Sequence, residues 1–157
     1  MNNESLKWKA VKEVMMVRSV DSAKRMLIVD DSAAVRRILG RMLVEEGFSV
    51  DTAGDGIAAQ DMLGKNEYDI VLVDLRMPIM SGIELYRHIE GGYPEVATKV
   101  VFMSADMPDP RTRSFFTKIN RPFLLKPFTI DDLMNEFRSC SQGVVSPDGS
   151  ETADKSF

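Results

Sequence analysis

Polar residues that could carry chemistry follow four short apolar segments of the sequence. In chain order these residues are Asp30 with Asp31, Asp74, Ser104 and Lys126. If the apolar segments are parallel strands, their carboxyl ends meet at one edge of a sheet, where open α/β sheets hold their sites. Three carboxylates placed together repel one another and raise one another's pKa unless a cation is present. Hard oxygen ligands of this kind favour Mg²⁺.

This set of residues predicts phosphoryl transfer to a carboxylate. Such a reaction depends mainly on positioning and charge neutralisation, and a carboxylate nucleophile needs no general base. Lys126 would add a positive charge, and the serine would add a hydroxyl donor. Taken singly, Asp30 and Asp31 have a simpler interpretation, because an Asp after a strand often caps the next helix. That interpretation does not suit Asp74, since a loop of residues 75–80 separates it from the next helix.

The elements that must position these residues begin with five strands. Residues 26–29, 70–73, 100–103 and 123–125 are continuous apolar runs, which are typical of strands covered on both faces. Residues 48–52 alternate between apolar and polar, as an edge strand does.

Helices are predicted between these strands. The first begins after a Ser32 cap and ends near Gly47. Its apolar stripe consists of Val35, Ile38, Leu39, Met42 and Leu43. Start signals for the third and fifth helices lie at Ser81 and Thr129, and residues 55–63 and roughly 109–118 supply the second and fourth helices. Strand and helix alternate throughout, and right-handed crossovers wind such a chain into an α/β fold with a doubly wound five-stranded parallel sheet, a three-layer α/β/α sandwich.

Composition and charge limit the class of protein. A chain of 157 residues that is 44% hydrophobic and 28% charged fits one soluble folded domain. A net charge of −4 disfavours direct DNA binding. No apolar run is long enough to span a membrane, and the single cysteine fits a reducing compartment. We therefore expect no membrane insertion and a cytoplasmic location.

The sequence divides into three parts. Residues 1–24 are an N-terminal extension with partial helical spacing, residues 25–140 are the folded domain, and residues 141–157 have the composition of a disordered polar tail. The extension could dock on the domain or support a homodimer. The polar tail is not expected to fold into a second domain.

Four motifs occur in order at the predicted strand ends. They read Val-Asp-Asp-Ser at 29–32, Val-Asp-Leu-Arg-Met-Pro at 73–78 followed by Gly82, Ser-Ala at 104–105, and Lys-Pro-Phe at 126–128. In these motifs, over roughly Arg25 to Cys140, the sequence resembles the receiver domain of two-component response regulators. The resemblance implies the flavodoxin-like fold of that family.

The resemblance implies that Asp74 is the phosphoacceptor. It implies that Asp31 binds Mg²⁺ together with Asp30, the latter partly through water. Asp74 itself and the backbone carbonyl of Arg76 would complete the protein ligands. The protein would then be no enzyme but a phosphoacceptor that assists its own phosphorylation and dephosphorylation.

The resemblance also assigns roles around the phosphoryl group. Lys126 would pair with one phosphoryl oxygen, and Ser104 would donate its hydroxyl to another and shift on activation. Phe123 takes the place of the switch aromatic residue, and the Lys126-Pro127 bond is expected to be cis. Signalling would use the face formed by the fourth helix, the fifth strand and the fifth helix.

The resemblance implies a histidine kinase or histidine phosphotransfer protein as phosphodonor and a downstream protein as target. The chain would be a single-domain response regulator or a phosphorelay shuttle. An alternative is a pseudo-receiver that only binds a partner, although the complete acidic cluster and Lys126 disfavour it. A metal-dependent phosphatase would need a second acid two residues after the nucleophile, where this sequence has Arg76.

The sequence departs from the receiver pattern in two regions. Residues 119–122 replace the small Gly-Ala pair that often precedes the fifth strand, and Pro108 and Pro110 stand at the start of the fourth helix. We therefore expect the fourth-helix region to differ from that of a typical receiver. The long cationic side chain of Arg76 is expected to overhang the phosphoryl group and alter the access of water.

Overall fold

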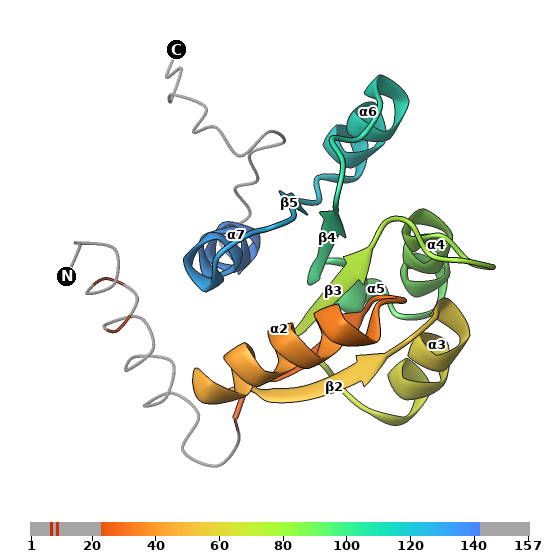
Figure 1. Cartoon of the computed structure of the whole chain (residues 1–157). Helices are drawn as coiled ribbons and strands as arrows, with labels where there is room; N and C mark the ends of the chain where they lie inside the picture. The colour runs from red at the N-terminus through yellow and green to blue at the C-terminus, as the bar shows by residue number, and fades with distance from the viewer. Residues whose placement is uncertain (1–6, 8, 10–22, 142–157) are drawn as a thin grey trace.

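The structure, a computed structural model, describes residues 7, 9 and 23–141 (Figure 1). Nearly all of the predicted N-terminal extension and polar tail lies outside the described residues. No helix among the residues described is both long enough and apolar enough to cross a membrane.

The centre of the fold is a five-stranded parallel sheet with the strand order β2-β1-β3-β4-β5. Its strands are β1 (Arg25–Val29), β2 (Ser49–Ala53), β3 (Ile70–Asp74), β4 (Val100–Ser104) and β5 (Phe123–Leu125). Every residue of β3 and β4 is buried, whereas β2 is partly exposed at one edge. The predicted parallel sheet, with β2 as an edge strand, is confirmed.

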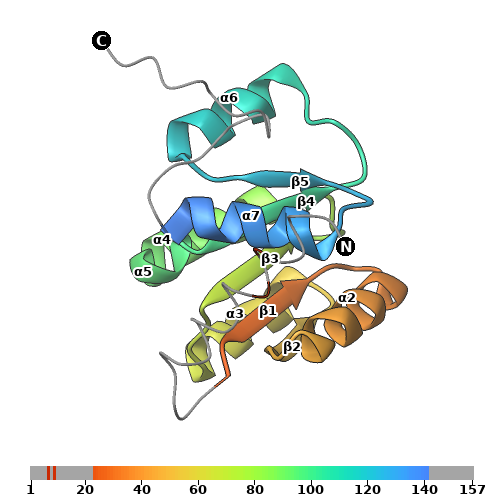
Figure 2. The same ribbon diagram turned by 90° about the vertical axis from the view of Figure 1, so that its left-hand side faces the viewer.

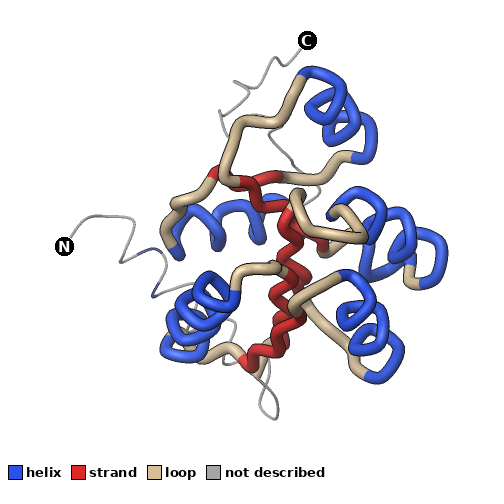
Figure 3. Tube along the Cα trace, turned by 45° about the vertical axis from the view of Figure 1, so that its right-hand side comes forward, coloured by secondary structure: helices blue, strands red, loops and turns tan. Residues whose placement is uncertain are grey.

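Helices cover both faces of the sheet, which gives the three predicted layers (Figure 3). They are α2 (Ala33–Glu45), α3 (Gly56–Lys65), α4 (Gly82–Gly92), α5 (Pro94–Ala97), α6 (Pro110–Ile119) and α7 (Ile130–Ser141). Helices α2 and α7 pack on one face, and α3, α4 and α6 pack on the other. Figure 2 shows α7 lying along the sheet beside β4 and β5. The single turn α5 was not predicted, because four residues are too few to show an apolar stripe.

Side-chain caps begin the helices where the sequence signals predict them. The Ser32 hydroxyl accepts a hydrogen bond from the backbone of α2. Ser81 and Glu84 form a complete capping box on α4. Thr129 and Asp132 exchange the same two hydrogen bonds at the start of α7. The shorter Asp side chain therefore accepts from the Thr129 backbone N–H in place of the usual Glu, and the Thr129 hydroxyl accepts from the Asp132 backbone N–H.

The region around α6 forms a regular helix despite its prolines. Pro110 occupies the first turn, where its missing N–H would have no helical partner, and Asp109 caps the helix. Asn120 ends the helix in the left-handed conformation, with a φ of 56°. The buried guanidinium of Arg121 donates to the Thr98 carbonyl. The prolines thus lie at or before the start of α6, and the expected difference from the receiver pattern stays a prediction.

Aromatic rings join α6 to the sheet. Phe116 is 1% exposed, and its ring centroid lies 4.8 Å from that of Phe102 on β4 and 5.5 Å from that of Phe123 on β5. Phe115 is only partly buried, against Tyr86 and under the Arg87 guanidinium. Of these two adjacent phenylalanines, only Phe116 is fully buried in the core.

Candidate functional site

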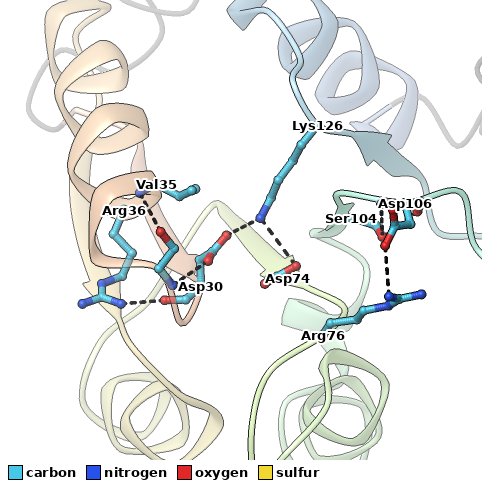
Figure 4. Close-up of polar contacts among 9 residues, drawn as sticks. Asp30, Val35, Arg36, Asp74, Arg76, Ser104, Asp106 and Lys126 are labelled. Carbon is cyan, nitrogen blue, oxygen red and sulfur yellow. Dashed lines mark hydrogen bonds and ion pairs between the residues drawn. The ribbon is translucent and has the colours of Figure 1, made fainter.

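Three carboxylates converge where β1 and β3 end, as the sequence predicts, and Figure 4 shows two of them, Asp30 and Asp74, on either side of the Lys126 ammonium. Asp30 and Asp31 follow β1, and Asp74 is the last residue of β3. One oxygen from each lies within 4.8 Å of the others. Asp30 is fully buried and Asp74 is 5% exposed, whereas Asp31 faces solvent. Strands β1 and β3 are neighbours although β2 lies between them in the chain, so this is the point where the strand order reverses.

Lys126 brings the only cation shown to contact these carboxylates among the described residues. Its Nζ lies 2.6 Å from Asp30 Oδ2 and 3.6 Å from Asp74 Oδ1. The backbone N–H of Lys126 donates to the Ser104 carbonyl at the end of β4, which fixes the loop that carries it. The following Lys126-Pro127 bond is cis, as expected.

Asp30 is held in place from the start of α2. The backbone N–H of Ser32 donates to Asp30 Oδ1 at 2.9 Å, and the Arg36 guanidinium donates to the Asp30 carbonyl at 2.7 Å. Ser32 is the residue that caps the helix. The capping interpretation of Asp30 and Asp31 is therefore wrong, and both carboxylates remain available to the site.

Burial and repulsion raise the pKa of Asp74 to about 6 from an ordinary value of 3.8. Burial is the largest cause, followed by the charge of Asp30, while Lys126 acts in the opposite direction. The carboxylate of Asp31 raises this pKa further. One ammonium thus does not compensate for three carboxylates. A divalent cation bound to oxygen ligands fits this donor set and this charge.

The Ser104 hydroxyl is engaged by its own loop. It is buried, donates to the Asp106 carbonyl at 2.6 Å and accepts from the Asp106 backbone N–H at 3.3 Å. The predicted contact with a phosphoryl oxygen would require these hydrogen bonds to be exchanged. Phe123, the predicted switch residue, is half-buried and stacks on Phe116.

The Arg76 side chain is paired with Asp106 at 3.0 Å, and both side chains are largely exposed. The Arg76 side chain points toward Asp106 in the loop after β4 and away from Asp74 (Figure 4). The expected overhang of Arg76 above the site is therefore not what the structure shows. Sequence reasoning missed Asp106, because an ion pair between two loops leaves no local pattern.

The loop between β3 and α4 approaches Asp74 closely. The Gly82 N–H donates to the Leu75 carbonyl, and a Cβ on Gly82 would lie 2.4 Å from the Asp74 carbonyl oxygen. No other residue type fits there without displacing the backbone of Asp74. In the same loop Ile79 has a φ of 72° and is 90% exposed. This conformation is unusual for a β-branched residue, and no glycine marks it in the sequence.

Residues 26–138 match the family described as the response regulator receiver domain. Response regulator MprA of Mycobacterium tuberculosis is 30% identical over 82% of this chain and 55% of its own length. Among solved structures, response regulator TrrA of Thermotoga maritima, in complex with Mg(2+)-BeF, is 30% identical with a TM-score of 0.64, covering 74% of this chain and 98% of that one. Chemotaxis protein CheY4 of Vibrio cholerae shares the fold, with 23% identity and a TM-score of 0.68 over 76% of this chain and 99% of that one.

The fold and the matched residues define a signalling module with a flavodoxin-like receiver fold. The chain belongs to the response regulator receiver domain family. It spans about half the length of the curated relatives it matches.

Two glycines of α4 make a matched test of the close approach to Asp74. Gly82→Ala should destabilise the domain by about 1–3 kcal/mol, because the new methyl group meets backbone rather than a mobile side chain. Gly91→Ala, with nothing within 4 Å, should stabilise it by roughly 0.5–1 kcal/mol through helix propensity. Urea unfolding measures both, and equal effects would contradict the close-approach argument.

The raised pKa of Asp74 predicts a pH-dependent stability. The folded-state pKa is above the unfolded one, so the native state holds the proton more tightly, and stability is lost as the pH rises from about 4 through about 6. Asp74→Asn should therefore be more stable than the parent at pH 7 by roughly 1–3 kcal/mol, and this gain should vanish near pH 4. Urea unfolding in a chelator at both pH values measures it.

Asp61→Asn removes an exposed carboxylate on α3 and shows the effect of losing one surface charge. A gain for Asp74→Asn that does not change with pH, or that Asp61→Asn reproduces, would contradict the assignment.

Proposed function

We propose that Asp74 accepts a phosphoryl group from a phosphohistidine on a partner protein, with Mg²⁺ bound beside it. The observation that carries the proposal is the position of Asp74, a nearly buried carboxylate between two further carboxylates and the Lys126 ammonium. The ion pair of Asp74 with Lys126, at 3.6 Å, is longer than that of Asp30, at 2.6 Å.

The proposed reaction is a direct displacement. A carboxylate oxygen of Asp74 attacks phosphorus, the bond between phosphorus and the imidazole nitrogen of the donor breaks, and that nitrogen leaves with the bonding electrons and takes up a proton. Lys126 pairs with one phosphoryl oxygen while the bond between phosphorus and the imidazole nitrogen breaks. Ser104 exchanges its hydrogen bond with Asp106 for one with another phosphoryl oxygen. These groups stabilise charge in positions set before the reaction begins.

Asp30, Asp31, Asp74 and the Arg76 carbonyl are the proposed protein ligands of Mg²⁺. The ion would neutralise charge on the carboxylates and on the phosphoryl oxygens. The fit rests on the clustered oxygens and on the raised pKa of Asp74, and the presence of Mg(2+)-BeF in the TrrA complex supports the choice of metal.

The proposed partners are a histidine kinase or histidine phosphotransfer protein as donor and a downstream protein as target. The module would work in the cytoplasm as a single-domain response regulator or as a phosphorelay shuttle, and it would assist its own phosphorylation and dephosphorylation. No observation favours a pseudo-receiver over this function, because the acidic cluster and Lys126 are both in place.

We place the signalling surface on the face formed by α6, β5 and α7. Ser104 ends β4 and Phe123 begins β5, the next strand of the sheet. A shift of Ser104 toward the phosphoryl group would vacate space next to β5. Phe123 has no hydroxyl to leave unpaired, so it can turn inward without losing a hydrogen bond.

Intact mass measurement with Mg²⁺ and a small phosphodonor tests the acceptor. The parent should gain one acid-labile phosphoryl group, and Asp74→Asn should gain none. Chelation should abolish the reaction, and Asp31→Ala should weaken Mg²⁺ binding because it removes one of three carboxylates. The same adduct on Asp74→Asn, or unchanged Mg²⁺ affinity in Asp31→Ala, would refute the respective assignments.

Aromatic NMR signals of Phe123 report the proposed coupling. They should shift when a phosphoryl mimic and Mg²⁺ are added, while signals of Phe48, a core residue just before the opposite edge strand, stay in place. Ser104→Ala should abolish the Phe123 shift but leave Mg²⁺ binding intact. Because a ligand only shifts existing populations, part of the inward state should be present beforehand. An unchanged Phe123 spectrum would exclude this route and leave the acceptor chemistry untouched.

A further inference from the structure

An apolar groove of about 310 Å³ runs along α2 next to the loop after β5. Its walls are Val35, Ile38, Leu39 and Met42 of α2, and Pro127 with Phe128 of the loop. Ile38 is 58% exposed, which is high for a large aliphatic side chain inside a cluster of apolar neighbours. The aliphatic stem of Lys126 also lines the groove, so it adjoins the acidic site.

The same face continues apolar toward α7. Phe128, Ile130 and Phe137 are partly buried and pack against the core cluster that α2 also covers. Helix α7 holds a second unusual feature, since Glu136 Oε2 is buried without a hydrogen-bond partner among the described contacts. Burial, and then the charge of Asp132, raises the pKa of Glu136. A segment with both apolar and basic side chains would stabilise this face, because it would cover the exposed apolar surface and supply hydrogen-bond donors to the unpaired carboxylate.

A candidate occupant of this groove is the segment of residues 1–22 of the same chain. It precedes Lys24, whose carbonyl accepts a hydrogen bond of 2.9 Å from the Ser49 N–H. Ser49 follows closely after the end of α2 at Glu45, so Lys24 lies near the carboxyl end of that helix. The groove extends from there along α2 toward the acidic site.

The length and sequence of the segment suit the groove. A helix of that length would span roughly 33 Å, against roughly 20 Å for the 13 residues of α2. Trp8, Val11 and Met15 are spaced to form one helical stripe, and Lys12 and Arg18 supply positive charge. Lys7 and Lys9, the described residues of this segment, have helical backbone and exposed side chains.

We propose that residues 1–22 dock in the groove between α2 and the loop after β5 of the same chain, with the stripe of Trp8, Val11 and Met15 turned inward. The docked segment covers Ile38 and packs against the loop that carries Lys126. The acidic site would then lie next to this intramolecular interface. A partner protein that binds the same part of α2 would have to displace the segment. This proposal does not depend on phosphorylation of Asp74.

Trp8 is the single tryptophan of the chain, so its fluorescence tests the proposal in the intact protein. Acrylamide should quench Trp8 much less in the folded protein than in the urea-unfolded chain. Ile38→Lys should remove this protection and shift the emission maximum to the red, because a charge is placed in the apolar groove. Met42→Lys, farther along α2, should act in the same direction.

Ile57→Lys is the matched control, because Ile57 is 59% exposed at the start of α3 on the other face of the sheet. It should leave Trp8 protected, and circular dichroism should show all three variants folded. Equal quenching in the folded and unfolded parent, or equal effects of Ile38→Lys and Ile57→Lys, would overturn the proposal. Protection that is lost on dilution of the parent would assign the groove to the segment of a second copy and would also overturn it.

Discussion

Mutual repulsion of three carboxylates at one edge of the sheet is the constraint on which the rest of the structure depends. Asp30 and Asp74 are almost fully buried, and no hydrophobic core would select such a pair. The fold tolerates them because Lys126 reaches both and because backbone donors at the start of α2 satisfy Asp30. The charge of Asp74 is compensated least, as the raised pKa of its carboxyl group indicates. The free energy stored in this charge imbalance favours binding a cation there.

The parallel topology places this imbalance where it can be used. Because β1 lies between β2 and β3, the chain leaves the strand ends of β1 and β3 in different directions and opens a crevice between them. Gly82 lets the next loop pass directly against the Asp74 backbone, and this contact limits how far the carboxylate can move. Strand ends and tight loops therefore hold the backbone that carries the carboxylates.

Two sets of contacts lead away from the site. On one side, Ser104 and Arg76 both bond to Asp106, so the loop after β4 is linked to the loop after β3. On the other face of the sheet, the stem of Lys126 borders the apolar groove of α2. Two neighbouring regions can therefore respond to a change of charge at Asp74. The loop after β4 is linked by hydrogen bonds, and the groove of α2 is linked by packing against the Lys126 stem.

Local patterns in the sequence determined the elements and the acidic cluster. Apolar runs, helix stripes and caps such as Ser81 with Glu84 are formed by neighbours in the chain, so the sheet, its helices and the residues at the strand ends could be predicted. The tertiary structure alone decided the pairing of Arg76 with Asp106 and the strained backbone of Ile79. Asp106 lies 30 residues from Arg76 in the chain, and two exposed charges so far apart carry no periodicity. Such contacts depend on where loops pass once the sheet has formed, and that path follows from packing of the whole domain rather than from any local run of residues.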